Sequence, residues 1–475
     1  MSGIAGQYGP DTEKQGINTI LEKMKHRGPD GVEVFSKSNV VVGQAKLSLI
    51  PENETDSDFK EQYLALDGDL PYTPEQLLKL FNQKGPEFIN ELNGPFALII
   101  GNSKTLFAAR DPLGVKPLYY GRRGDNWYFA SEIKGLSNKV EEIKYFPPGY
   151  YFDSEKGFVK YSEDIRFKEK DDVNDIEKTC RDIRESVIEA VEEALNENIP
   201  TGILLSGGID SSVIAAAAAE VSDEKLQTFS VGLEGSEDLE NARKVADYLG
   251  TEHHEYTYST DEMMDILSDV IYYLESFDAP LVHSSIANFI VSRMAKQNGI
   301  KMVLCGEGSD ELFAGYDYLK KFDSHRELNK ELENLISGLH NGGLQRVDRM
   351  ANAHSLEAKV PFLNEKVVDL ALTVPAKWKI KGEEKIEKWI LRKAFSGLLP
   401  DEILWRKKAK FHEGTGSSDV MKELIDKKID DAEFIKEKQK QESIDFLTKE
   451  EMYYYNIFCD YFPESAVNTV NRTEY

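Results

Sequence analysis

Short apolar runs separated by glycine and proline turns dominate the chain up to about residue 160. Runs of this length at this spacing are typical of strands in stacked antiparallel sheets. Amphipathic patterns in the same region predict two helices, near 16–25 and 74–84. The clearest strand candidates are Val40-Val41-Val42, Phe96-Ala97-Leu98-Ile99-Ile100 and Trp127-Tyr128-Phe129.

The pattern changes after a charged stretch, 164–175, which carries few apolar residues and is the best candidate for a linker. Beyond it, longer amphipathic helices alternate with short apolar strands such as 226–231 and 301–305. Such alternation predicts a parallel sheet with crossover helices. We therefore expect two domains, 1–160 and 176–475.

The composition is that of a globular protein, with 40% hydrophobic and 30% charged residues. The formal charge is −26, from 58 basic and 84 acidic residues, and it disfavours nonspecific binding to nucleic acid or anionic membranes. No apolar run has the length of a membrane span and no signal-peptide pattern is found, so we expect a cytoplasmic protein. The cysteines lack metal-site or disulfide spacing and are expected to be buried, reduced thiols; they are Cys180, Cys305 and Cys459.

The segment 206–212, Ser-Gly-Gly-Ile-Asp-Ser-Ser, is the most informative part of the chain. It lies between an apolar run, 203–205, and an alanine-rich stretch, 213–219, which predicts a strand, a tight turn and a helix. Backbone N–H groups at such a helix N-terminus bind phosphate. No lysine follows the glycines, so the loop is not of the Walker type. It is similar to the pyrophosphate loop of N-type ATP pyrophosphatases, which release AMP and pyrophosphate; an ordinary strand-to-helix connection is the alternative.

A second strand, glycine turn and helix start are predicted at 303–313, Val-Leu-Cys-Gly-Glu-Gly-Ser-Asp-Glu-Leu-Phe. In a doubly wound sheet both loops would lie at the carboxyl ends of strands, where ligands bind. We expect Asp210 and Asp310 to face each other across a triphosphate and to share Mg²⁺, a cation that prefers oxygen ligands. The alternative for Asp310 is a helix N-cap.

With these two loops in place, the chain resembles the asparagine synthetase family, the glutamine-dependent type with an N-terminal glutaminase domain. The resemblance runs nearly from end to end, and the order and spacing of its segments make it specific. The further matching segments are Phe229-Ser230-Val231-Gly232, Tyr273 to Asp278, Asp348-Arg349, Leu356 to Asn364, Trp389 to Arg392, Trp405 to Phe411 and Tyr453 to Pro463.

The resemblance implies an N-terminal α+β domain, an Ntn-hydrolase-like αββα sandwich. It implies a C-terminal α/β doubly wound parallel sheet, like that of the adenine nucleotide alpha hydrolases, with added helices. It also implies that the side-chain carboxylate of aspartate attacks the α-phosphate of ATP, and that ammonia then displaces AMP to form asparagine. The ligands implied for ATP and its pyrophosphate are Leu205, Ser206, Gly207, Gly208, Asp210, Ser211, Ser212, Val231, Gly306 and Glu307.

Two charged residues are expected to act in this reaction. Lys408 is our candidate for the positive charge needed as the α-phosphate becomes five-coordinate; a solvated member of a basic run is the alternative. Glu357, in the matching motif, is the candidate base for the ammonium-like intermediate; a structural ion pair is the alternative. Lys359 and Asn364 stand where the family has Arg and Asp, and the exchange of a guanidinium fork for an ammonium at 359 keeps the charge but changes the hydrogen-bond geometry.

The N-terminal half departs from the family where glutamine hydrolysis needs particular residues. Ser2 stands where the family exposes a nucleophilic cysteine by removing the initiator Met, and a hydroxyl ionises far less than a thiol. Lys46 replaces the arginine expected for the glutamine α-carboxylate, and Asp67-Gly68 replaces the Asn-Gly pair of the oxyanion hole, where a carboxylate would repel the developing charge. The segment for a Ser-Asp pair reads Tyr72-Thr73-Pro74-Glu75. We expect a glutaminase fold that has lost glutamine hydrolysis.

The sequence thus predicts an AMP-forming amide ligase that uses ATP and Mg²⁺ to make asparagine from aspartate and free ammonia. The alternatives are a ligase or a lactam or peptide cyclase acting on another carboxylate through an acyl-AMP, residual Ser2-dependent amidohydrolysis, and a sensor without turnover. Small molecules are the expected partners, and neither nucleic acid nor a membrane is expected. A homodimer and a separate ammonia-supplying subunit both stay open.

Overall fold

The computed structural model describes residues 2–49, 61–168, 175–195, 198–406, 417–440 and 444–473. The chain divides into two compact units. The first unit comprises Met1–Asp164, Asn352–Ser355 and Phe458–Arg472, and the second comprises Ile165–Ala351, Leu356–Ile457 and Thr473–Tyr475.

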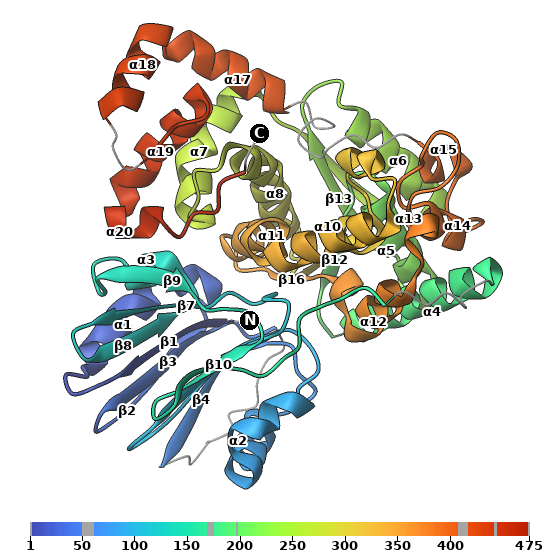
Figure 1. The fold of residues 1–475 in the computed structure, drawn as a ribbon. Coiled ribbons are helices and arrows are strands. Elements are labelled where there is room, and N and C mark those ends of the chain that lie inside the picture. The colour runs from blue at the N-terminus through green and yellow to red at the C-terminus, as the bar shows by residue number, and fades with distance from the viewer. Residues whose placement is uncertain are drawn as a thin grey trace. The chain divides into compact units, whose positions relative to one another are not determined.

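Two antiparallel sheets form the centre of the first unit (Figure 1). One sheet has the order β2-β3-β1-β8-β7-β9, and the other has the order β11-β10-β6-β5-β4. Their strands are β1 (Ser2–Tyr8), β2 (Gly31–Lys37), β3 (Val40–Lys46), β4 (Gln62–Gly68), β5 (Phe96–Asn102), β6 (Leu106–Arg110), β7 (Tyr119–Arg123), β8 (Asn126–Ala130), β9 (Glu142–Tyr145), β10 (Tyr150–Asp153) and β11 (Gly157–Lys160).

Because apolar residues alternate along the strands, each sheet has an apolar face, and these two faces pack against each other. The shared core contains Ile4 and Val42 from one sheet, and Ile99 and Ala108 from the other. The second face of β5 packs under helix α2 (Pro74–Lys84), whose buried residues include Leu77. Helix α1 (Lys14–Lys23) packs on strands of the opposite sheet. These helix, sheet, sheet and helix layers confirm the αββα sandwich.

Local sequence fixes where the two predicted helices begin and end. α2 coincides with the predicted 74–84 because Thr73 caps it: the Thr73 side chain accepts from the Gln76 N–H, Gln76 reciprocates, and Pro74 opens the first turn. The helix expected near 16–25 is α1, which ends at Lys23 and is followed by a 3₁₀ turn, Lys25–Arg27.

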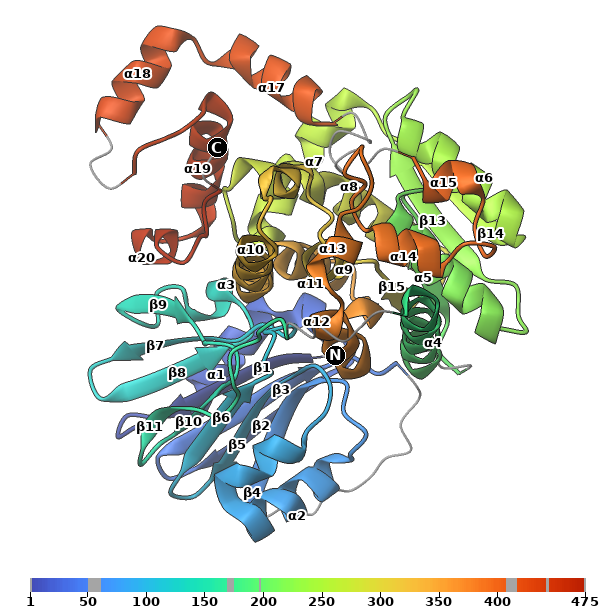
Figure 2. The same cartoon turned by 45° about the vertical axis from the view of Figure 1, so that its right-hand side comes forward.

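A five-stranded parallel sheet forms the centre of the second unit, in the order β14-β13-β12-β15-β16. Helices lie on both sides of it (Figure 2), as expected for a doubly wound sheet. The strands are β12 (Thr201–Leu204), β13 (Gln227–Gly232), β14 (Glu252–Thr257), β15 (Met302–Leu304) and β16 (Glu357–Lys359). This arrangement confirms the predicted α/β fold of the C-terminal half.

Added helices connect and extend this sheet. α5 (Ile209–Val221) packs on both α4 (Ile176–Ala194) and α6 (Glu237–Leu249), α7 (Thr260–Leu274) packs on α8 (Ala279–Gln297), and both α6 and α8 pack on β13. The other described helices that follow in the chain are α9 (Ser309–Phe313), α10 (His325–Gly338), α11 (Gly343–Asn352), α12 (Glu365–Thr373), α13 (Ala376–Lys379), α14 (Trp389–Ala394), α15 (Asp401–Leu404), α17 (Ser417–Lys428), α18 (Asp431–Lys440) and α19 (Lys449–Tyr461). Two further helices, α3 (Ile133–Leu136) and α20 (Glu464–Val467), belong to the first unit.

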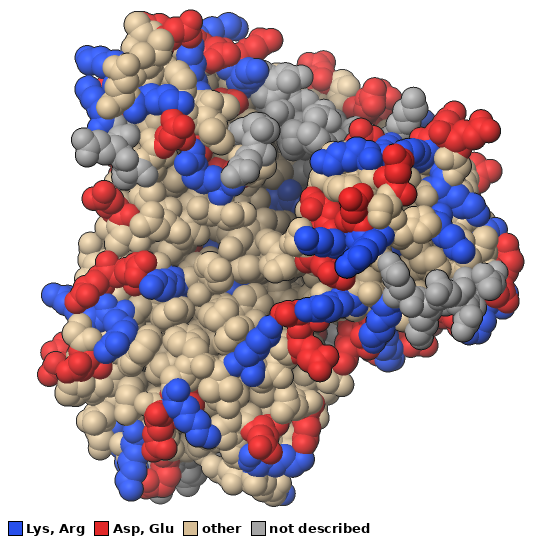
Figure 3. Space-filling model, in the orientation of Figure 1, with Lys and Arg blue, Asp and Glu red and all other residues tan. Residues whose placement is uncertain are grey.

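The surface charges and the exposure of the cysteines can be compared with what the composition led us to expect. Acidic and basic side chains are interspersed over the face drawn in Figure 3, so the acidic excess forms no single patch there. Within the described ranges, no helix has the length and apolar character needed to cross a membrane. Cys180 and Cys305 are buried, but Cys459 is exposed. The expectation of three buried thiols is therefore wrong for Cys459, which lies near the end of α19.

Candidate functional sites

The two predicted loops lie at the carboxyl ends of adjacent parallel strands, β12 and β15. After β12 the chain crosses to β13 on one side, while β15 pairs with β12 on the other. This is the kind of switch point at which open α/β sheets bind ligands. A Cβ added to Gly306 would lie 2.8 Å from Cβ of Asp210 and 2.9 Å from the Ser211 nitrogen. The tertiary structure thus brings the two loops into direct contact.

Serine hydroxyls and a glycine fix the shape of the first loop. Ser211 Oγ accepts from the Ser206 N–H at 3.1 Å and donates to the Gly208 carbonyl at 3.2 Å. Gly207 has φ +69°, and a Cβ there would lie 2.4 Å from the Ala242 nitrogen, so the turn requires glycine. Ser212 is fully buried, and its Oγ has no hydrogen-bond partner in the part of the chain that the structure describes.

Helix α5 begins directly after this turn. Its N-cap is Gly208, which provides no side-chain cap hydrogen bond. Gly208 therefore leaves the first N–H groups of the helix without a side-chain cap of its own, and the helix dipole favours negative charge at this end. Leu205 and Val231, the expected neighbours of adenine, are both buried, and Leu205 pairs with β13 through its N–H to the Phe229 carbonyl at 2.9 Å.

Asp210 and Asp310 are joined by a residue that the sequence did not single out, Lys388. Lys388 Nζ lies 2.6 Å from Asp310 Oδ1 and also contacts Asp210 Oδ1. The lysine side chain is 0% exposed, whereas those of Asp210 and Asp310 are 23% and 22% exposed. Burial lowers the pKa of Lys388, but the two carboxylates raise it and prevail. Asp310 lies inside α9, whose N-cap is Gly308, so the N-cap alternative is wrong.

These two carboxylates suit Mg²⁺, which commonly takes one or two protein carboxylates and completes its shell with phosphate oxygens and water. Over the described ranges, no group of three or more His, Cys, Asp or Glu side chains is arranged to hold a metal by itself. A magnesium ion here would therefore take the rest of its ligands from nucleotide oxygens and water. The assignment of Asp210 and Asp310 as its ligands stays a prediction.

Further charged groups follow β15 in the second loop. Arg346 Nη2 lies 2.5 Å from Glu307 Oε1, and Tyr316 donates to Glu311 at 2.5 Å. Burial, together with the charge of Asp310, raises the pKa of Glu311. Because Glu307 carries a carboxylate, it could meet a phosphate only through a cation or through its own backbone N–H. Its place among the ATP ligands stays a prediction.

The structure describes one of the two expected catalytic residues, Glu357. Glu357 is buried in β16, where it pairs with Met302, while Lys359 pairs with Leu304. Glu357 therefore lies two residues before the ligand edge of the sheet, roughly 7 Å of strand. Lys408 lies outside the described residues. Both roles stay predictions.

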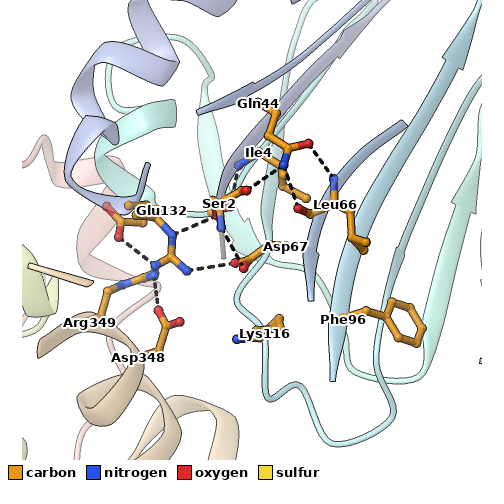
Figure 4. Close-up of polar contacts among 12 residues, drawn as sticks. Ser2, Ile4, Gln44, Leu66, Asp67, Phe96, Lys116, Glu132, Asp348 and Arg349 are labelled. Carbon is orange, nitrogen blue, oxygen red and sulfur yellow. Dashed lines mark hydrogen bonds and ion pairs between the residues drawn. The ribbon is translucent and has the colours of Figure 1, made fainter. Parts of the chain in front are cut away.

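In the first unit, the position of the family nucleophile lies inside a network of hydrogen bonds and ion pairs (Figure 4). Gln44 Nε2 donates to Ser2 Oγ at 2.6 Å, and the Ser2 N–H donates to Asp67 Oδ1 at 3.2 Å. Arg27, wholly buried, donates from Nη2 to Asp67 at 2.9 Å and from Nη1 to Glu132 at 3.1 Å. The Asp67 carboxylate thus faces both the start of β1 and a buried guanidinium.

The other residues expected at the altered glutaminase site have local partners. Lys46 Nζ pairs with Glu33 at 2.7 Å across β3 and β2. Gly68, the last residue of β4, pairs in register with Phe96. Thr73 is the N-cap of α2, an ordinary structural role. The structure therefore brings Ser2 and Asp67 together, and it gives Lys46 and Thr73 partners on neighbouring elements.

Comparison with known proteins covers both halves of the chain. The family model described as asparagine synthase matches residues 182–332 and 319–466. Two models described as glutamine amidotransferase domains match residues 72–138 and 1–70. The chain belongs to the asparagine synthetase family. Members of this family are ATP-dependent carbon–nitrogen ligases, so the expected enzyme class is confirmed.

Curated members of the family are similar over nearly their whole length. Asparagine synthetase B [glutamine-hydrolyzing] of Escherichia coli is 34% identical over 481 residues, covering 93% of this chain and 87% of that protein. Asparagine synthetase [glutamine-hydrolyzing] 2 of Arabidopsis thaliana is 33% identical, covering 98% and 88%. A probable asparagine synthetase of Schizosaccharomyces pombe is 34% identical, covering 95% and 91%. These names describe glutamine-hydrolysing enzymes and do not by themselves support the loss of glutamine hydrolysis here.

The sequence alone did not identify the polar site residues Lys388, Arg346 and Gln44. Lys388 immediately precedes the matching segment 389–392, but a lone lysine before an apolar run carries no sign of a distant acidic partner. Gln44 is one polar residue within an apolar strand, which hints at an inward hydrogen bond without naming the partner. No signal in the sequence marks Arg346.

Proposed function

We propose that this protein adenylates the side-chain carboxylate of aspartate and forms asparagine from free ammonia. The supporting observation is the joining of the two loops, with Asp210 and Asp310 within reach of one cation. Membership of the family supports the reaction class. The near full-length similarity to asparagine synthetases supports aspartate as the acyl donor.

In the first step, an aspartate carboxylate oxygen forms a bond to the α-phosphorus of ATP, and the bond from that phosphorus to the bridging oxygen of the β-phosphate breaks. The α5 N-terminus would bind the pyrophosphate through its first N–H groups, which Gly208 does not cap with a side chain. Magnesium would be held by Asp210 and Asp310 and would offset the charge that develops on the phosphate oxygens. Water exclusion would protect the acyl-AMP from hydrolysis.

In the second step, the nitrogen of ammonia attacks the acyl carbon, the bond from this carbon to the AMP oxygen breaks, and the nitrogen loses a proton. Glu357 is the proposed acceptor of this proton. Its position before the ligand edge of the sheet leaves a gap that the side chain or a water molecule must span. Lys408 is proposed to act at the α-phosphate in the first step.

The polar contacts of Ser2 support ammonia as the nitrogen source. A glutaminase nucleophile needs a base to take its proton and donors that stabilise an oxyanion. Here Ser2 Oγ accepts from Gln44, and the neighbouring Asp67 presents a carboxylate instead of a donor. In a chain processed to Ser2, as in the family, the α-amino group would lie beside Asp67. An adjacent carboxylate favours the protonated amine, which cannot serve as a base.

The loss of the glutamine pocket is supported by Lys46 as well. The resemblance assigns this position to recognition of the glutamine α-carboxylate, yet Lys46 Nζ is paired with Glu33. A lysine offers a point charge where the family offers a planar, bidentate guanidinium. To bind glutamine here, the ion pair between Lys46 and Glu33 would have to break, and the single ammonium of Lys46 would have to hold the α-carboxylate in place of a guanidinium.

One set of assays tests the proposal. The protein is incubated with ATP, Mg²⁺ and aspartate, with either ammonium or glutamine, while AMP, pyrophosphate, glutamate and asparagine are measured. We expect asparagine and AMP with ammonium, and neither glutamate nor asparagine with glutamine. Asparagine formed from glutamine would refute the loss of glutaminase activity. AMP release only with a different carboxylic acid would refute aspartate as the substrate and leave the adenylation chemistry intact.

A further inference from the structure

Lys388 occupies the position between the two carboxylates to which the proposed function assigns magnesium. Its ammonium contacts Asp210 Oδ1 and lies 2.6 Å from Asp310 Oδ1. A cation bound to those same two oxygens would need the space that the ammonium fills. Both carboxylates keep about a fifth of their surface exposed, so a ligand can reach them, whereas the lysine is 0% exposed.

Backbone packing holds the lysine at this point. Lys388 has φ +53°, a left-handed conformation that is unfavourable for a residue with a side chain, and it precedes α14. A Cβ on Gly315 would lie 1.8 Å from Asp310 Oδ1 and 2.1 Å from Lys388 Cε. Positive φ outside glycine persists where the surroundings determine it, and such residues cluster at functional sites. The fold therefore determines where this ammonium lies.

The charges explain why a lysine would be useful here before any nucleotide binds. Asp210 and Asp310 come from different loops, and without a cation their like charges would push the loops apart. The ammonium offsets this repulsion and keeps both carboxylates oriented. When a metal enters without nucleotide, the displaced ammonium would be buried with no anion to pair with, which is costly. When the metal enters with ATP, phosphate oxygens provide new partners for the ammonium.

We propose that Lys388 holds the place of the metal in the free enzyme and moves to the phosphates when metal and nucleotide arrive together. Free divalent cation is then excluded, and the metal site exists only in the presence of nucleotide. The inference rests on the proposed assignment of Asp210 and Asp310 as metal ligands. It concerns this site before catalysis and makes no use of aspartate or ammonia.

Binding of Mn²⁺, used as a paramagnetic substitute for Mg²⁺, tests the proposal on the full chain. Electron paramagnetic resonance reports bound and free Mn²⁺ with and without a non-hydrolysable ATP analogue bridged by carbon between the α- and β-phosphorus. We expect wild type to bind Mn²⁺ weakly alone and tightly with the analogue. Lys388→Met should bind Mn²⁺ alone at least about tenfold more tightly than wild type, because it leaves two carboxylates without their cation.

Matched variants separate this effect from general damage. Lys393→Met removes a lysine within α14 that is paired with Glu177 at the surface, and it should leave Mn²⁺ binding unchanged. Lys388→Arg keeps the charge and should still exclude Mn²⁺. Adding Asp210→Asn to Lys388→Met should abolish the new site. Circular dichroism and thermal unfolding establish that each variant is folded.

Two results would overturn the proposal. The first is a wild type that binds Mn²⁺ as tightly without the ATP analogue as with it; this measurement does not depend on the stability of any variant. The second is tight Mn²⁺ binding that survives Asp210→Asn, which would refute the metal assignment itself. Failure of aspartate to support AMP formation would refute only the proposed function, because these binding measurements contain no aspartate.

Discussion

Arg27 offers a sharp test of the idea that ion pairs of the protein itself now fill the glutaminase-like site. Its guanidinium lies 2.9 Å from Asp67 Oδ2 and 3.1 Å from Glu132 Oε1, and all three side chains are 0% exposed. Arg27→Met removes the shared cation but keeps an unbranched apolar stem. Two carboxylates then stay buried with fewer partners, so we expect the first unit to lose stability.

The size of the loss can be worked out from the remaining partners. Removing one member of a buried pair costs about 3–5 kcal/mol. Asp67 would keep the Ser2 N–H at 3.2 Å, and Glu132 would keep Lys134 at 2.7 Å, which places the loss in the lower part of that range. For about 3–4 kcal/mol, a unit of this size should lose roughly 6–16 °C in Tm.

Calorimetry on the full chain measures the change in Tm. Because two units need not unfold together, hydrogen exchange of peptides from β1 and β4 then shows whether the first unit is the one that loses stability. Arg123→Met is the matched control, since this arginine is exposed on β7 and should shift stability by less than about 0.5 kcal/mol. Arg27→Met combined with Asp67→Asn should recover part of the loss. If Arg27→Met were as stable as the control, the reasoning that the pairs maintain this site would be refuted.

Three further predictions concern the two sites. Asp210→Asn should lower AMP formation at least about 100-fold while leaving the protein folded, as measured by AMP release and circular dichroism; a fully active variant would exclude Asp210 as a metal ligand. Ser2→Cys alone should release glutamate from glutamine at least about 100-fold more slowly than a glutamine-hydrolysing relative, because Asp67 still stands where an oxyanion donor is expected and loss of one such donor costs about 10²–10³ in kcat; release at the relative's rate would contradict that view. Burial and the charge of Asp310 raise the pKa of Glu311 above its ordinary value of 4.5. At a pH between 4.5 and the raised pKa, the Glu311 carboxyl therefore keeps its proton in the folded protein but loses it in the unfolded chain. Stability should therefore fall as pH rises from about 4.5 through the raised pKa, and urea unfolding of Glu311→Gln should show a flatter dependence over that window.

Much of the architecture followed from local patterns. The run at 96–100 became β5, the stretch after Gly208 became α5, and the start at Thr73-Pro74 fixed α2 to the residue. These features depend on periodicity, turn residues and caps, which act over a few neighbouring positions. For the same reason the sequence located both predicted nucleotide loops, and it identified Ser2, Lys46 and Asp67 as departures from the pattern expected of a glutaminase.

Local sequence patterns did not predict contacts between residues that are far apart in the chain. Nothing near Lys388 in the chain indicates that its ammonium would lie between Asp210 and Asp310, 178 residues from the former. For Glu357, the motif indicated a catalytic base, but only the fold shows how far the residue lies from the site. The register of β16 with β15 places Glu357 before the ligand edge of the sheet.

The sequence by itself determined the family, the two sheet types, and which residues stand in the predicted nucleotide loops and at the glutaminase-like positions. These are properties of residue identity and local spacing. Only the tertiary structure decided how charges are paired: Lys388 with the two loop aspartates, Arg27 with Asp67 and Glu132, and Gln44 with Ser2. Pairing of buried charges depends on which segments the fold brings together, because an ion pair is stabilised by the distance between its atoms and by exclusion of water.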